Sequence, residues 1–284
     1  MKACRVVVCA LVGALLLMQS QLEGASPTIA WLDMLLKQPP TKRALSSSPR
    51  IDLSLLEERN IYSERFGVVL CWAVVPREAA RVKVDDVRDT ADSTLKLYEK
   101  VAHPLDIAVL NGGFYGLDQR GSRIPLGLVI SQGVVRNRLI GWKTGGVLEI
   151  GARLDIVPIA RFVQRREIRA AVQSKPLVVE AGKVAIHSKG GDLANRSAIG
   201  LTPEGDVILA GAFSATNQAM TLYEFAEFLA AGPASGGPDA YIALAMDGGP
   251  GAHIYFPGAR HHCGTDGPNY VPNVVRVSLA TAGN

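Results

Sequence analysis

The sequence carries little surplus charge of either sign. Among 284 residues, 30 lysines and arginines stand against 26 aspartates and glutamates, which gives a formal net charge of +4. The two signs are interspersed along the chain, so we expect no nucleic-acid partner. With 48% hydrophobic residues, the chain is long enough to bury a large core, as one large domain or two small ones.

The N-terminal apolar run is too short to cross a bilayer comfortably. It covers residues 6–18, whereas a spanning helix needs ~20 residues. Lys2 and Arg5 precede the run, and Gly24 and Ala25 follow it, which is the pattern of a secretory signal peptide. We therefore predict a signal peptide over residues 1–25, no stable membrane span, and a periplasmic or secreted protein.

Cysteine is scarce, and two of the four cysteines lie inside the predicted signal peptide. The remaining pair, Cys71 and Cys263, can form one disulfide in an exported protein, or Cys71 can be a buried thiol. The sequence leaves both open, because it does not give the distance between the two residues. The run His261-His262-Cys263 lacks the paired spacing of structural zinc sites. We expect no cofactor, with a divalent metal left open.

Strand patterns outnumber helix patterns. Helical spacing of apolar residues occurs over residues 90–102 and 221–231, and Thr221 and Glu224 form a capping box at the start of the second helix. Apolar runs bounded by turn residues recur from residue 66 onwards. The predicted fold class is α+β, with a mixed, largely antiparallel β core and flanking helices in a single domain.

Residues 26–65 are weakly patterned and rich in proline and serine in their middle. We predict an N-terminal extension or linker over 26–65, followed by one domain over 66–284.

Two apolar runs end in similar turns. Residues 240–246 lead into Asp247, Gly248 and Gly249, and residues 105–110 lead into Asn111, Gly112 and Gly113. Runs of this kind indicate strands buried on both faces, and glycines let a ligand approach the backbone closely. For a single D-G-G, a turn in which the aspartate caps its own backbone is the simpler interpretation. Two such turns suggest that both strand ends face one cleft.

Arg196 and Ser174 are two further candidates. Arg196 stands at the start of an apolar hairpin, where it can form a salt bridge at the sheet edge or bind a phosphate through its planar guanidinium. The sequence leaves these two roles open. Ser174 has no histidine or aspartate at a recognised nucleophile spacing, so a surface hydroxyl is the simplest interpretation of it.

Six segments, taken in order, resemble the phosphodiester glycosidase family, which includes exported bacterial proteins and an animal enzyme that removes N-acetylglucosamine from phosphodiesters. The segments are Asn111-Gly-Gly-Phe-Tyr, Pro125-Leu-Gly-Leu-Val-Ile-Ser-Gln-Gly, Gln173-Ser-Lys-Pro-Leu, Arg196-Ser-Ala-Ile-Gly, Thr221-Leu-Tyr-Glu-Phe-Ala-Glu-Phe-Leu and Met246-Asp-Gly-Gly-Pro. The resemblance covers roughly residues 66–279. Gly251 and Lys175 differ from the family pattern, in which a serine and a small residue are usual at these positions.

The resemblance implies an exported hydrolase that cleaves a sugar from a sugar-1-phosphodiester, in cell-envelope or exopolysaccharide metabolism. It implies catalytic roles for Asp247 and Arg196, with Asp247 as nucleophile or base and Arg196 suited to the anionic phosphate. Two alternatives are a non-catalytic module that binds polysaccharide or an envelope partner, and a metal-dependent phosphodiesterase. The implied substrate-binding residues are Asn111, Gly112, Gly113, Gln173, Ser174, Gly248 and Gly249.

Overall fold

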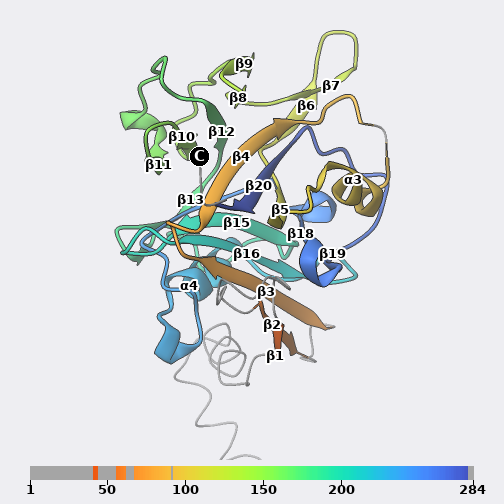
Figure 1. Cartoon of the computed structure of the whole chain (residues 1–284). Helices are drawn as coiled ribbons and strands as arrows, with labels where there is room; N and C mark the ends of the chain where they lie inside the picture. Colours follow the sequence, from red (N-terminus) through yellow and green to blue (C-terminus); the bar gives the residue numbers. More distant parts are fainter. Residues whose placement is uncertain (1–40, 44–55, 62–66, 91, 281–284) are drawn as a thin grey trace, which may run out of the picture. The chain divides into compact units, whose positions relative to one another are not determined.

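Antiparallel strands dominate the computed structural model, which describes residues 41–43, 56–61, 67–90 and 92–280 (Figure 1). Among these residues, every strand pairing is antiparallel. The same residues contain two α-helices, α3 (Thr94–Val101) and α4 (Leu222–Ala230). The largely antiparallel β core is confirmed, but the α+β class is only roughly right, because the helices contribute so little of the fold.

The largest sheet has eight strands in the order β1-β2-β3-β16-β15-β17-β13-β14. Its first two strands lie within residues 26–65, the predicted extension, and add to the edge of the sheet next to β3. The predicted signal peptide lies outside the described residues. The strands are β1 (Thr41–Arg43), β2 (Leu56–Ile61), β3 (Val68–Val75), β16 (Val207–Phe213), β15 (Arg196–Leu201), β17 (Ile242–Ala245), β13 (Leu177–Glu180) and β14 (Lys183–Val184).

Two five-stranded sheets and one hairpin complete the strands. The second sheet has the order β19-β18-β5-β20-β4, the third has the order β11-β10-β12-β8-β9, and β6 pairs with β7 alone. The strands are β4 (Ala80–Asp86), β5 (Asp106–Asn111), β6 (Tyr115–Leu117), β7 (Arg123–Pro125), β8 (Val129–Ser131), β9 (Val134–Asn137), β10 (Gly146–Ile150), β11 (Leu154–Pro158), β12 (Ala170–Ser174), β18 (His253–Phe256), β19 (His261–Gly264) and β20 (Asn273–Leu279). Short 3-10 helices occur at η1 (Ile159–Arg161), η2 (Pro233–Ser235), η3 (Gly249–Gly251) and η4 (Pro257–Ala259).

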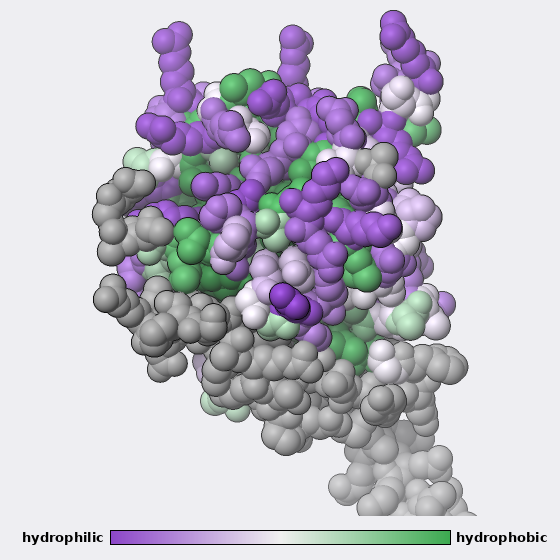
Figure 2. Space-filling view, turned by 45° about the vertical axis from the view of Figure 1, so that its right-hand side comes forward, coloured by the Kyte–Doolittle hydropathy of each residue, from purple (hydrophilic) through white to green (hydrophobic). Residues whose placement is uncertain are grey.

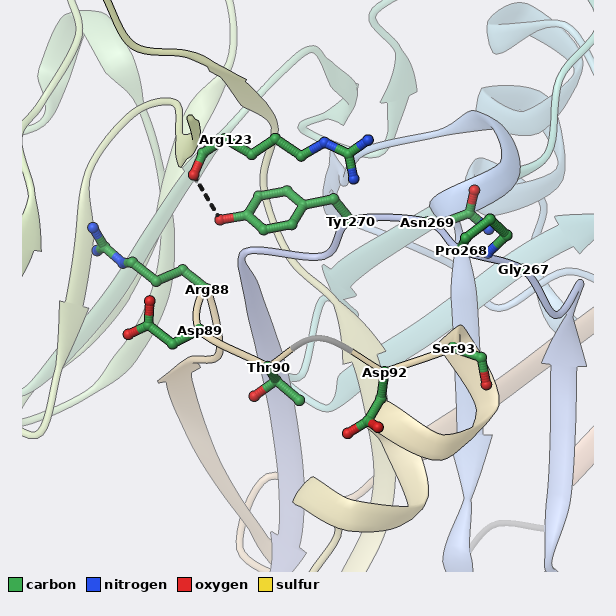
Figure 3. A pocket seen from close by; sticks show the side chains of 10 residues that line it. All are labelled: Arg88, Asp89, Thr90, Asp92, Ser93, Arg123, Gly267, Pro268, Asn269 and Tyr270. Atoms are coloured by element: carbon green, nitrogen blue, oxygen red, sulfur yellow. Dashed lines mark hydrogen bonds between the residues drawn. The ribbon is translucent and has the colours of Figure 1, made fainter. Parts of the chain in front are cut away.

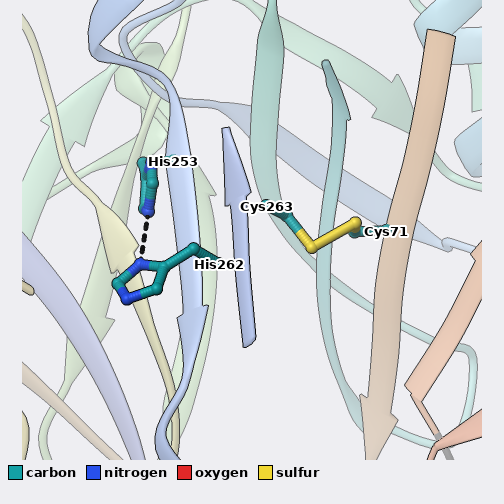
Figure 4. The surroundings of a disulfide bond; sticks show 4 residues. All are labelled: Cys71, His253, His262 and Cys263. Atoms are coloured by element: carbon teal, nitrogen blue, oxygen red, sulfur yellow. Dashed lines mark hydrogen bonds between the residues drawn. A yellow bond between two sulfur atoms is a disulfide. The ribbon is translucent and has the colours of Figure 1, made fainter. Parts of the chain in front are cut away.

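The main core is one hydrophobic cluster to which all three large sheets contribute, for example through Leu209, Ile254 and Leu148. A disulfide between Cys71 on β3 and Cys263 on β19 joins the first two sheets (Figure 4). Its Cα atoms are 6.4 Å apart, within the usual range for a disulfide. Figure 2 shows hydrophilic side chains over much of one face, with apolar ones visible between them.

Helix α4 begins at the predicted capping box. The Glu224 amide donates to Thr221 Oγ1 at 3.2 Å, and the Thr221 amide donates to Glu224 Oε2 at 2.8 Å. The end of the helix is tied to the chain that enters β17, because the Ala240 amide donates to the Leu229 carbonyl at 2.8 Å. Helix α4 therefore helps to position the strand that leads to Asp247. Neither helix of the described residues is long and apolar enough to span a membrane.

Candidate active site

The two glycine turns meet in the structure. The Asp247 amide donates to the Gly112 carbonyl at 3.0 Å, and Asn111 Nδ2 donates to the Asp247 carbonyl at 2.8 Å. The strands that end in these turns, β5 and β17, belong to different sheets. The site therefore forms where two sheets end side by side, as the repeated turn sequence indicates.

The side chain of Asn111 is fully occupied by hydrogen bonds. Its Oδ1 accepts from Ser197 Oγ at 2.7 Å and from the His253 amide at 3.0 Å. Its Nδ2 donates to the carbonyls of Asp247 and Gly112, at 2.8 and 3.3 Å. An asparagine side chain has two donor hydrogens and two lone pairs, so this capacity is used up. Asn111 is 1% exposed and fastens strand ends together at the floor of the site.

The side chain of Asp247, in contrast, is partly exposed. It lines a narrow pocket together with Gly112, Gly251 and Tyr270, and it accepts no hydrogen bond from a described residue. Burial raises the pKa of Asp247 to about 7, because removal from water disfavours the charged form. Near neutral pH this carboxyl is therefore present in both protonation states, which suits a group that transfers protons.

Arg196 is held in place by two carbonyls at the start of β15. Its Nε donates to the Met220 carbonyl at 3.0 Å, and its Nη2 donates to the Asp192 carbonyl at 2.7 Å. The third nitrogen, Nη1, lies 3.6 Å from the point that a β-carbon on Gly248 would occupy. No described carboxylate forms a salt bridge with Arg196, and burial lowers its pKa. The guanidinium thus keeps one edge beside the D-G-G turn.

Most of the glycine amides at the two turns already donate hydrogen bonds within the protein. The amides of Gly112 and Gly113 donate to the carbonyl and Oδ1 of Asn273, both at 2.9 Å. The Gly249 amide donates to the Asn195 carbonyl at 2.8 Å. Among the amides of these four predicted glycines, that of Gly248 alone makes no hydrogen bond to a described residue.

Both glycines of the N-G-G turn are required for space. A β-carbon on Gly112 would overlap Asn273 Oδ1, and one on Gly113 would lie 2.6 Å from the Gln173 carbonyl oxygen. Sequence reasoning missed Asn273, which is fully buried. Its position at the start of the last strand, directly after Pro272, is the only local signal for it.

Gln173 and Ser174 are buried at the end of β12, and neither lines the Asp247 pocket. Gln173 Oε1 accepts from the amides of Leu128 and Ile140, at 2.9 and 3.0 Å, and its Nε2 donates to the Ile140 carbonyl at 2.6 Å. The interpretation of Ser174 as a surface hydroxyl is wrong, because its side chain is fully buried. Its neighbour Lys175 places Nζ over the Trp142 ring, 4.9 Å from the centroid.

The histidines His253 and His262 and the cysteine Cys263 lie on the paired strands β18 and β19. Cys263 is bonded to Cys71, so neither sulfur is the thiolate that a metal site uses. His253 Nε2 and His262 Nδ1 share a hydrogen bond of 2.9 Å (Figure 4). Burial lowers the pKa of His253 to about 3, so its imidazole is neutral at physiological pH. His253 is a packed core residue whose backbone supports Asn111.

The family model for phosphodiester glycosidases matches residues 106–278. This span includes the N-G-G turn, Arg196 and the D-G-G turn, and it covers more than half of the chain. The chain belongs to the phosphodiester glycosidase family.

This chain is also similar to a curated protein by sequence and to solved structures by fold. It is 33% identical over 128 residues to the uncharacterized protein YigE of Escherichia coli, with 41% of this chain and 47% of that protein covered. The chain thus matches about half the length of that curated relative. Its fold is similar to the zebrafish N-acetylglucosamine-1-phosphodiester alpha-N-acetylglucosaminidase catalytic domain, auto-inhibited by its pro-peptide, with a TM-score of 0.59, 16% identity and coverage of 84% and 87% of the two chains.

A second solved structure has the same fold. It is a putative exported protein from Burkholderia pseudomallei, with a TM-score of 0.56, 11% identity and coverage of 75% of this chain and 74% of that chain. At such identities the likeness concerns the fold alone.

Proposed function

We propose that this chain is a hydrolase that releases a sugar from a sugar-1-phosphodiester by breaking the bond between the anomeric carbon and the phosphate oxygen. The observation that carries the proposal is the partly exposed carboxylate of Asp247, which has no hydrogen-bond partner among the described residues. Asp247 begins the D-G-G turn, and its backbone is bonded to the N-G-G turn, in a member of the phosphodiester glycosidase family. The site offers this substrate a carboxylate for the anomeric centre and a cation for the phosphate.

Asp247 serves as the nucleophile or the general base. In its ionised form it either attacks the anomeric carbon or takes a proton from the attacking water. A pKa of about 7 makes the ionised form available near neutral pH and keeps the carboxylate basic enough to accept a proton. The leaving group is a phosphate monoester, which departs readily, so the mechanism needs no strong second acid.

Arg196 and the Gly248 amide are the donors for the diester phosphate. Two carbonyls fix the guanidinium of Arg196, so little side-chain freedom is lost when Nη1 binds an oxygen. The Gly248 amide lies in the turn beside this nitrogen. A cation and an amide donor at the D-G-G turn can hold the phosphate while the sugar is transferred.

The test is turnover of a panel of sugar-1-phosphodiesters by the purified protein, with and without a chelator, in ¹⁸O-labelled water. Cleavage at the anomeric carbon places the label in the released sugar. Label in the phosphate would mean attack at phosphorus and would replace the glycosidase proposal by a phosphodiesterase. Binding of the diesters without any turnover would identify a non-catalytic glycan-binding module.

We also propose that the protein acts outside the cytoplasm, on a glycan of the envelope or an exopolysaccharide. The support is the charged and apolar pattern of residues 1–25 and the disulfide, since such bonds persist in oxidising compartments. Fractionation of cells that express the full chain, with N-terminal sequencing of the product, tests this. A cytoplasmic product that retains Met1 would contradict it.

A further inference from the structure

A second cavity, of about 590 Å³, is lined by residues that include Arg88, Arg123 and Tyr270 (Figure 3). It adjoins the Asp247 pocket. Tyr270 lines both spaces. Asn269, also in the cavity wall, donates from Nδ2 to the Pro250 carbonyl of the glycine turn at 2.9 Å. The volume falls in the range of small-molecule sites. A substrate with its scissile bond over Asp247 therefore has room beside Tyr270 for a further group.

Arg123 provides the positive charge in this cavity. Its guanidinium carbon lies 5.7 Å from the Tyr270 ring centroid and 5.9 Å from that of Tyr115. Tyr270 also donates its hydroxyl proton to the Arg123 carbonyl at 3.0 Å (Figure 3). Ring contacts of this kind orient a guanidinium without neutralising it. Arg123 forms no salt bridge with any described residue, so its charge is available to a ligand.

The second arginine of the cavity is already neutralised. Arg88 forms a salt bridge of 2.8 Å with Asp86. Of the two acids in the cavity wall, Asp92 pairs with Lys100 at 3.3 Å. In Figure 3 the Asp89 carboxylate lies on the side of Arg88, and the Arg123 guanidinium lies on the side of Asn269. Of the two arginines in the cavity wall, Arg123 is therefore the one without a salt bridge to a described residue.

We propose that this cavity binds a second anionic group of the substrate, a carboxylate or phosphate separate from the scissile diester, with Arg123 as its partner. This inference rests on the proposed hydrolase function. A planar guanidinium binds such oxyanions through two parallel hydrogen bonds. The anionic group can be carried by the sugar half or by the alcohol half of the diester, and the two sources are separated by experiment.

The first experiment compares three synthetic diesters. In the first, the diester phosphate is the only charged group. The second has a uronic acid as its sugar, and the third has a phosphorylated alcohol. The wild-type protein should prefer one charged diester over the neutral one in kcat/KM. Arg123→Gln should lower that preference about tenfold, the worth of one charge-assisted contact. Arg120→Gln removes an exposed arginine from the turn of the same β6–β7 hairpin and should leave the preference at the wild-type value.

The second experiment measures binding without turnover. Titration of the wild-type protein with inorganic phosphate should shift the backbone amide signals of Gly267, Asn269 and Tyr270 in NMR spectra, and Arg123→Gln should abolish these shifts.

Wild-type protein that cleaves all three diesters equally would overturn the cavity proposal and leave the hydrolase proposal standing. Phosphate binding that depends on Arg123, in a protein that cleaves no diester, would overturn the hydrolase proposal instead. Unchanged shifts in Arg123→Gln would also overturn the cavity proposal.

Discussion

The N-G-G turn and the D-G-G turn have nearly the same sequence and opposite uses. Asn111 is buried and spends all four of its hydrogen-bonding positions on the protein. Asp247 has its backbone held at both the amide and the carbonyl, while its carboxylate faces a pocket. One turn builds the site and the other presents the reactive group. An amide can satisfy donors and acceptors at once, whereas an open carboxylate keeps its charge for a ligand.

The largest expected effect comes from Asp247→Asn. We expect turnover of a sugar-1-phosphodiester to fall by at least about 10²–10⁴-fold, because an amide neither accepts a proton nor attacks the anomeric carbon effectively. The fold should persist, since the contacts of Asp247 to Asn111 and Gly112 use backbone atoms. Steady-state kinetics with circular dichroism as the folding control measure this. Near wild-type turnover in the variant would remove Asp247 from the mechanism.

The reciprocal change, Asn111→Asp, should act on stability. It deprives the carbonyls of Asp247 and Gly112 of their side-chain donor and buries a carboxylate at a site that is 1% exposed. We expect a loss of about 2–4 kcal/mol in the free energy of unfolding. Urea denaturation measures it, with Asp247→Asn as the matched substitution at the other turn. Equal stabilities of the two variants would contradict the division of roles between the turns.

The pH dependence of stability separates the two turns further. The pKa of Asp247 rises from 3.8 to about 7 on folding, so between these values the unfolded chain is ionised and the native chain keeps the proton. The carboxylate therefore costs the native state stability as pH increases from about 4 to 7. Asp247→Asn should match the wild type below pH 4 and exceed it by roughly 1–3 kcal/mol above pH 7, allowing for partial exposure.

Denaturation at a series of pH values gives this difference directly. A constant difference between pH 4 and 8 would show that the native carboxyl ionises normally. The same titration should appear in the kinetics, because a base or nucleophile acts in its ionised form. We expect turnover to rise as pH passes about 7.

Arg196→Lys should have the smallest of these effects. Lysine keeps the positive charge but loses the fork that the carbonyls of Met220 and Asp192 hold in place. We expect an increase of about tenfold in KM for diesters with the fold intact. Arg161→Lys, at an exposed arginine paired with Glu180, is the control and should not change KM. Unchanged kinetics in Arg196→Lys would restrict Arg196 to a structural role.

Features that depend on near neighbours in the chain were predictable from the sequence. The capping box of α4 needs only Thr221 and Glu224, three residues apart, and the structure has both of its hydrogen bonds. The buried strands before the two glycine turns follow from apolar runs at residues 105–110 and 240–246. The abundance of strands was also evident, although the sequence overstated the share of helix.

Other features depend on contacts between distant residues, and only the tertiary structure decides them. Asn111 and Asp247 are 136 positions apart, and nothing near Asn111 in the chain shows that its side chain has no capacity left for a substrate. The burial of Ser174, the part played by Asn273 and the disulfide between Cys71 and Cys263 have the same origin. The sequence by itself determined which residues end the buried strands. The packing of separate sheets determined which of those residues hold the site together and which one keeps its side chain free of hydrogen bonds. The reason is that buried polar groups bond to the partners that the fold brings near.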